Sequence, residues 1–217
     1  LHRVDRRQRQ MCIRDSLIEN GNVLFEQSVG IEAIESDRFL IIVVGSDPAL
    51  LTSLSAMPIS GVNGVTVLHM TPDDLPSHAL VLRGVNAIFI HDVDTAALSP
   101  DQRTALRDWV MLGGQLVVGG GINGERTAAG LADLLPVEVT RTLAQGDLTP
   151  LARLGGSEPQ PSTGPLLTVI PRPGAEALPA GHSLIYRGRL GSGMVIFSTF
   201  DLALLRGCLL YTSDAAD

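Results

Sequence analysis

Short, continuous apolar runs recur along the chain, separated by polar or amphipathic stretches of helix length. The runs are rich in β-branched side chains, which is typical of strands buried on both faces of a parallel sheet. The four clearest are Phe39–Val44, Val65–Met70, Asn86–Asp92 and Gln115–Val118. Strands that alternate with helices form βαβ units, so this pattern predicts a mainly parallel sheet with helices on both faces.

The clearest helix is predicted between the third and the fourth of these runs. Residues 99–102, Ser-Pro-Asp-Gln, have the spacing of a capping box with proline at the first helical position. Leu106, Trp109 and Val110 then fall on one face, which predicts that Trp109 packs in the core, and Gly113 is placed to end the helix. Shorter helices are predicted at Ala49–Met57, Leu75–Arg83, Asn123–Leu135 and Asp147–Leu154.

The second half of the chain predicts further strands. They are Val137–Leu143, Leu166–Pro171, His182–Leu190 and Gly193–Phe200. The last two are joined through Gly191 and Ser192, which favours an antiparallel hairpin. The complete pattern predicts an α/β fold: a mainly parallel, flavodoxin-like three-layer sandwich with helices on both faces and a C-terminal antiparallel hairpin.

The two ends of the chain differ from its body. Residues 1–16 carry five arginines without apolar periodicity, and residues 208–217 abruptly follow a strand-like stretch. Both resemble translated sequencing-adapter read-through at the edges of metagenomic gene fragments, so we expect two non-native tails. A genuine basic N-terminal region is the alternative for the first. Residues 38–207 are then the α/β domain, and residues 17–37 are the end of a preceding β segment or a linker.

Composition limits the kinds of functional site that residues 17–207 can contain. Cys12 and Cys208 both lie in the expected tails, so we expect no disulfide, no thiolate metal site and no cysteine nucleophile. All sixteen basic residues are arginines, and the net charge of −7 argues against nucleic acid as a partner. No apolar run approaches the roughly 20 residues that span a bilayer. We expect no cofactor and no metal.

The stretch Ala97–Gly121 resembles the class I glutamine amidotransferase-like superfamily. The shared pattern is an amphipathic helix ending in Trp-Val-x-x-Gly-Gly, then a strand, then a glycine-rich elbow. The likeness covers roughly Arg38–Leu205 and is closest to domains of large bacterial surface proteins, which are usually membrane-anchored. Active members of the family carry a cysteine nucleophile on this elbow, in a G-x-C-x-G setting.

This chain departs from the family at its catalytic positions. The strand runs into Gly119–Gly121 with no cysteine, serine or threonine on the turn. The only histidine beyond the turn is His182, and no H-x-E motif surrounds it. The resemblance therefore implies the fold, while the residues argue against glutamine hydrolysis.

The glycine turn is itself a candidate ligand site. Gly119, Gly120 and Gly121 precede a predicted helix, where free N–H groups and the helix dipole favour an anion. Asn123, with Arg126 and Thr127, could contact an anionic or sugar ligand from the first turn of that helix. The alternative, which we favour, is a tight turn that needs glycine for its geometry, followed by a solvated surface.

A second candidate is the polar cluster that follows the third strand. His91, Asp92 and Asp94 could supply an acid/base pair or hold a divalent metal. The alternative is a capping and turn loop before the Ser99 helix. We favour the loop, because no second histidine or carboxylate motif has recognisable ligand spacing.

Two functions therefore remain open. The first is a non-catalytic binding or structural module of a larger, extracytoplasmic, membrane-anchored protein, with other domains of the full-length chain as partners and the membrane reached only through segments outside this fragment. The second is a hydrolase that uses His91, Asp92 and Asp94. A pocket that gathers these three residues with another carboxylate would favour the hydrolase.

Overall fold

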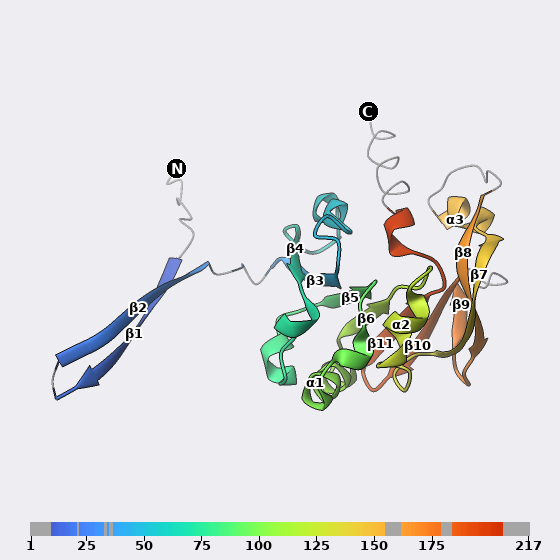
Figure 1. Cartoon of the computed structure of the whole chain (residues 1–217). Helices are drawn as coiled ribbons and strands as arrows, with labels where there is room; N and C mark the ends of the chain where they lie inside the picture. The colour runs from blue at the N-terminus through green and yellow to red at the C-terminus, as the bar shows by residue number, and fades with distance from the viewer. Residues whose placement is uncertain are drawn as a thin grey trace, which may run out of the picture. The chain divides into compact units, whose positions relative to one another are not determined.

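Figure 1 shows the computed structural model of the whole chain. The structure describes residues 10–20, 22–32, 34, 37–154, 162–178 and 184–205. The expectations for loop residues 155–161, for His182 and for the tail 208–217 lie outside this part of the chain. The chain divides into two compact units, Leu1–Arg38 and Phe39–Asp217.

The first unit is an antiparallel β-hairpin. Strand β1 (Gln10–Glu19) pairs with β2 (Asn22–Glu32), and Asn20 in the turn has a φ of 50°. Strand β2 therefore lies within residues 17–37, the segment expected to be the end of a preceding β segment or a linker. Its partner β1 begins within residues 1–16, the expected foreign tail. Backbone pairing requires no particular side chains, so the hairpin is compatible with either origin of that segment.

The second unit contains a mostly parallel sheet of seven strands in the order β4-β3-β5-β6-β11-β10-β9. The five neighbours β4, β3, β5, β6 and β11 pair in parallel, and β10 runs antiparallel between β11 and β9. The strands are β3 (Phe39–Gly45), β4 (Val65–Met70), β5 (Ala87–His91), β6 (Gln115–Val118), β9 (Glu176–Leu178), β10 (Ile185–Leu190) and β11 (Gly193–Ser198). The structure thus confirms the mixed α/β class, the parallel core and the C-terminal antiparallel hairpin.

Helix α1 (Pro100–Met111) forms as its sequence predicts. The Ser99 hydroxyl accepts the Gln102 N–H, and the Gln102 side chain accepts the Ser99 N–H, at 3.1 and 2.9 Å. Gly113, with a φ of 120°, follows the helix. Trp109 is buried, and its indole N–H donates to the carbonyl of Val85 at 3.3 Å.

Most of the other expected helices are much shorter than the sequence pattern predicts. The segments before and after β4 contain only the 3-10 turns η1 (Thr52–Ala56), η2 (Pro72–Asp74) and η3 (Ala79–Leu82). The remaining elements are η4 (Thr95–Ala97), α2 (Gly124–Ala129), α3 (Thr149–Leu154) and η5 (Leu202–Leu204). Serine and proline are frequent in these segments and a helical apolar stripe is weak, so tertiary contacts decide their conformation.

Alternate side chains of the strands enter two separate cores. Ile42 and Ile88 belong to the first, which also contains Trp109 of α1 and Ala128 of α2. The second core lies on the other side of the sheet and receives Ile41 and Val43 together with residues from the η1 and η5 segments. Both faces are therefore buried. Within the described residues, α-helices contribute only to the first of these two cores.

Strands β7 (Val137–Asp147) and β8 (Thr163–Pro171) pair with each other in a separate antiparallel ribbon. Leu148 and Leu151, in the segment that follows β7, pack with Leu184 and Phe200 in a third, small core. No helix in the described part of the chain is long and apolar enough to cross a membrane.

Candidate functional site

The carboxyl ends of the parallel strands meet at one edge of the sheet, and polar side chains gather there. This is the position at which open α/β sheets bind ligands. We call the set the carboxyl-edge cluster; its members are Ser46, His91, Asp92, Asn123, Arg126 and Asp201. They lie in the segments that follow β3, β5, β6 and β11, except His91, which is the last residue of β5.

Asp92 is the centre of the cluster. Its carboxylate accepts a hydrogen bond from the Ser46 hydroxyl at 2.9 Å and from the Asn123 amide at 2.7 Å, and it pairs with the Arg126 guanidinium at 3.3 Å. The φ of Asp92 is 51°, in the left-handed region that aspartate tolerates better than most residues. Asp92 therefore connects side chains from the segments that follow β3 and β6 to the end of β5.

His91 is directed to a different carboxylate. Its side chain is buried, and its Nε2 lies 2.8 Å from Oδ1 of Asp201. Because a carboxylate only accepts, the imidazole proton lies on Nε2. The other ring nitrogen, Nδ1, is buried without a hydrogen-bond partner and faces Gly119, where a Cβ would collide with it. The ring is therefore held between the glycine turn and Asp201.

Asp201 has two structural tasks. Its Oδ1 also accepts the N–H of Ala203 at 2.8 Å and so caps η5. The hydrogen bond from His91 is the main cause of a lowered pKa for Asp201, and the bond from Ala203 acts in the same direction against partial burial. Sequence reasoning missed Asp201; the signal that could have found it is its position as an N-cap just after a strand.

The lowered pKa of Asp201 predicts a pH effect. Ionised Asp201 stabilises the fold above its unfolded pKa of about 3.9, and this contribution disappears as the pH falls through the lower folded pKa. Asp201→Asn should therefore show a shallower loss of stability than the wild type on acidification below about pH 4. Urea unfolding midpoints of the two proteins, measured by circular dichroism between about pH 7 and about pH 2, test the expected difference in stability.

Asp94→Asn is the matched control for that measurement. Asp94 is exposed and accepts the N–H of Ala96 at 3.0 Å, a capping bond that asparagine also makes. Its acid profile should follow that of the wild type. Parallel profiles for the wild type and Asp201→Asn would contradict the role assigned to Asp201.

The glycine turn does not offer the free N–H groups that an anion cradle needs. Gly119 donates to the Ile90 carbonyl at 2.8 Å, Gly120 to Phe200 at 3.2 Å and Gly121 to Thr199 at 3.3 Å. These bonds argue against the anion-cradle interpretation, which the sequence did not favour: the turn is bonded to the strand ends around it. The following helix, α2, has only six residues and adds no N-terminal site of its own.

The turn is also too crowded for side chains. A Cβ on Gly120 would lie 2.5 Å from the Ser198 carbonyl oxygen, and a Cβ on Gly121 would lie 2.9 Å from Cβ of Asp201. Gly121 has a φ of 85°, a conformation that favours glycine. The geometric interpretation of the glycines, which the sequence favoured, accounts for these contacts.

The three residues of the hydrolase hypothesis have different partners. His91 pairs with Asp201, Asp92 binds Ser46, Asn123 and Arg126, and Asp94 caps η4. Among the residues that the structure describes, no group of three histidine, cysteine or acidic side chains could hold a metal ion. Of the other predicted contacts, Asn123 and Arg126 join the cluster, whereas Thr127 is buried and bonds to the Asn123 carbonyl.

Comparisons with known proteins identify structures of similar fold but give no evidence about a reaction or a ligand. No protein-family model and no curated protein matches the chain. A cytoplasmic protein from Salmonella typhimurium LT2 is similar in structure, with a TM-score of 0.56, 17% identity and 95% of each chain covered. A second Salmonella typhimurium cytoplasmic protein has a TM-score of 0.54 and 15% identity over 93% of this chain and 95% of its own.

A β-galactosidase from Bacillus circulans sp. alkalophilus is more distant. Its TM-score is 0.46 and its identity 13%, over 82% of this chain and 31% of the enzyme. At these identities the two Salmonella proteins show a shared fold alone, and the galactosidase likeness is too low to support an argument.

Proposed function

We propose that this chain is a non-catalytic, amidotransferase-like module with a binding or structural role in a larger protein. For the fold we propose the flavodoxin-like three-layer arrangement. The parallel sheet with both faces buried supports it, as do α1 and α2 on the first face. On the second face, within the described part of the chain, the short η1 and η5 segments occupy the positions where that arrangement has helices.

The observation that carries the functional proposal is the closed glycine turn. The resemblance places a cysteine nucleophile on the elbow after β6. Here the three elbow positions are glycines whose Cβ positions are blocked by His91, Ser198 and Asp201. A nucleophile must project from the turn toward substrate, so this packing supports a turn that serves structure rather than catalysis.

The state of the carboxyl-edge cluster also favours a structural role for this edge. The Asp92 carboxylate already has three donors, and Nε2 of His91 is bonded to Asp201. A general base needs a ring nitrogen within reach of a substrate proton. The second nitrogen of His91 instead faces Gly119 from a buried position, so the hydrolase alternative has less support.

An extracytoplasmic, membrane-anchored location stays a prediction from the resemblance. This prediction concerns segments outside the described residues. The same holds for the further domains that we expect as partners. The two Salmonella neighbours are named cytoplasmic proteins, which gives this location no support.

Glutamine hydrolysis tests the proposal directly. The purified full chain should release no ammonia from glutamine above the uncatalysed background, because the elbow carries no nucleophile. A coupled glutamate dehydrogenase assay measures this, with an active amidotransferase as the positive control. Gly121→Cys should also be inactive, since a side chain there meets Asp201.

The His91→Gln variant separates real activity from contamination. Ammonia release by the wild type that disappears in His91→Gln, while the variant stays folded by circular dichroism, would overturn the proposal. Ammonia release that does not follow the amount of folded chain across purification fractions would identify a contaminating glutaminase and leave the module without activity of its own, as proposed.

A further inference from the structure

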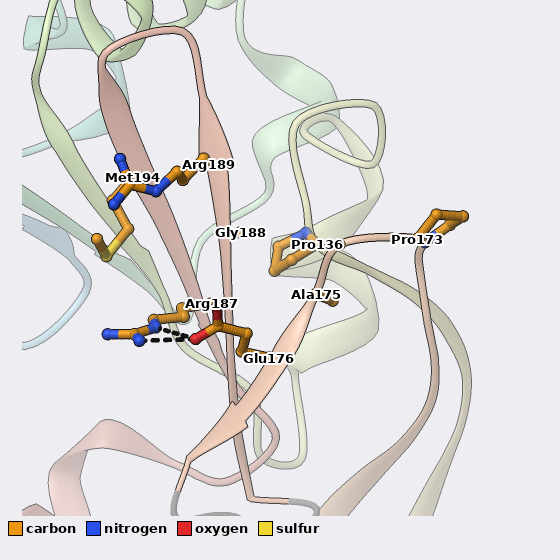
Figure 2. A pocket seen from close by; sticks show the side chains of 9 residues that line it. Pro136, Pro173, Ala175, Glu176, Arg187, Gly188, Arg189 and Met194 are labelled. Carbon is orange, nitrogen blue, oxygen red and sulfur yellow. Dashed lines mark hydrogen bonds and ion pairs between the residues drawn. The ribbon is translucent and has the colours of Figure 1, made fainter.

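A hollow of about 390 Å³ lies at the outer edge of the seven-stranded sheet, where β9 begins beside β10 (Figure 2). We call it the edge hollow. It is bounded by β10 and β11, by the residue that precedes β7 and by the turn that follows β8. Its lining includes Pro136, Pro173, Glu176, Arg187, Gly188, Arg189 and Met194. None of them belongs to the carboxyl-edge cluster.

The backbone of β10 is only partly covered on this side. Strand β9 pairs with Ile185–Arg187, and no strand in the described part of the chain lies beside the last three residues of β10 on that edge. The Leu184 carbonyl accepts the Thr199 N–H, so the even-numbered residues of β10 bond toward β11. By this alternation, the N–H and C=O of Arg189 point outward, into the uncovered edge.

A tight turn keeps this edge open. The Ala175 N–H donates to the Arg172 carbonyl at 3.0 Å, with Pro173 and Gly174 between them and a φ of 84° at the glycine. This is the sequence and geometry of a type II turn. The chain therefore turns just before β9 starts, and β9 reaches β10 only at Glu176.

The charges beside the hollow are unequal. Arg187 donates through Nε and a terminal nitrogen to one oxygen of Glu176, at 2.8 and 2.6 Å, as the dashed lines in Figure 2 show. Arg189 lies two residues further on the same strand face, opposite Met194. It is exposed and has no acidic partner among the residues that the structure describes. On a chain of net charge −7, it is an unneutralised cation.

We propose that the edge hollow binds an extended acidic peptide segment, which adds to β10 beside Arg189 as a short strand. The N–H and C=O of Arg189 bond to the backbone of the peptide, as in β-strand addition to an open sheet edge. An acidic side chain on the peptide's arginine-facing side pairs with the Arg189 guanidinium. Pro136 limits the hollow next to Gly188, where a Cβ would lie 2.9 Å from the proline ring.

An arginine on an open strand edge also has a protective use, because charge there discourages edge-to-edge aggregation. The edge hollow distinguishes the two uses: protection needs only an exposed charge, whereas a peptide needs space beside the free backbone groups. The inference deepens the proposed function and rests on it for the idea of a binding module. Peptide binding and ammonia release are separate measurements, so either proposal can fail while the other stands.

The probe is a fluorescein-labelled hexapeptide of alternating threonine and glutamate, titrated against the ¹⁵N-labelled full chain. Alternation places the glutamates on one face of the added strand. We expect saturable binding, with the largest amide shifts at Gly188, Arg189 and Leu190. The same peptide with N-methyl groups on alternate backbone amides should bind at least about fivefold more weakly, because it loses a strand hydrogen bond.

Two substitutions of Arg189 test the side chain and the backbone separately. Arg189→Gln should weaken peptide binding at least about tenfold, whereas Arg83→Gln, which removes an exposed arginine elsewhere, should leave it unchanged. Arg189→Pro also removes the outward N–H and should weaken binding further. Proline is tolerated where an edge N–H faces outward, and thermal unfolding by circular dichroism verifies that the variant folds.

Three results would overturn the proposal: no amide shifts near Arg189 with the acidic peptide, equal binding of the N-methylated peptide, or equal effects of Arg189→Gln and Arg83→Gln. Any of them would leave Arg189 as a charge that protects an open edge.

Discussion

Replacement of Gly120 by alanine is expected to lower the free energy of unfolding by about 3 kcal/mol. A Cβ at this position would lie 2.5 Å from the Ser198 carbonyl oxygen and 2.6 Å from the carbonyl carbon and oxygen of Thr199. These are backbone atoms at the end of β11, so no side chain can rotate away. Relief of the overlap requires the two strand ends to separate, which strains the hydrogen bond from Gly120 to Phe200.

Gly84→Ala is the matched control for this substitution. A Cβ on Gly84 meets nothing within 4 Å, and its backbone is not in the left-handed region. Its effect should stay within about 0.5 kcal/mol, or be slightly stabilising, because alanine restricts the unfolded chain. Urea unfolding, followed through the fluorescence of the single tryptophan, compares the variants. Equal midpoints would show that the close approach at Gly120 relaxes without cost.

Trp109→Ala is expected to cost about 4 kcal/mol, the largest effect among the single substitutions considered. The ring is 4% exposed, lies in the core between α1 and the sheet, and packs against Gly114. Alanine leaves a cavity that backbone on both sides cannot readily fill, and it removes the hydrogen bond to Val85. Circular dichroism must report this unfolding, because the variant has no tryptophan left.

Leu112→Ala is the control for Trp109. Leu112 directly follows α1 but is 80% exposed, so its truncation creates no cavity and should change stability by no more than about 0.5 kcal/mol. A cost for Trp109→Ala as small as that for Leu112→Ala would mean that the core beneath α1 collapses around the missing ring. Trp109, which helix periodicity places in the core, would then contribute little to the free energy of unfolding.

The sequence predicted those parts of the fold that depend on local patterns. The apolar runs of β3 and β5 indicate strands because a strand buried on both faces needs apolar side chains at successive positions. The capping box, the apolar stripe and Gly113 predicted α1 and its end, because each acts within a few residues. The turn at Gly191–Ser192 likewise indicated the β10–β11 hairpin.

The tertiary structure decided what depends on residues far apart in the chain. The segments around β4 have no strong helical stripe and form 3-10 turns. Strands β7 and β8 pair with each other in a separate ribbon rather than with the main sheet. The N–H groups of the glycine turn donate to carbonyls near the end of β11 and in β5. His91 pairs with Asp201 rather than with Asp92. No local pattern carries that information, because it arises only when the order of strands brings distant chain ends to one edge. The sequence shows that the turn carries no cysteine, serine or threonine; only the packed structure shows that the space for a side chain there is filled.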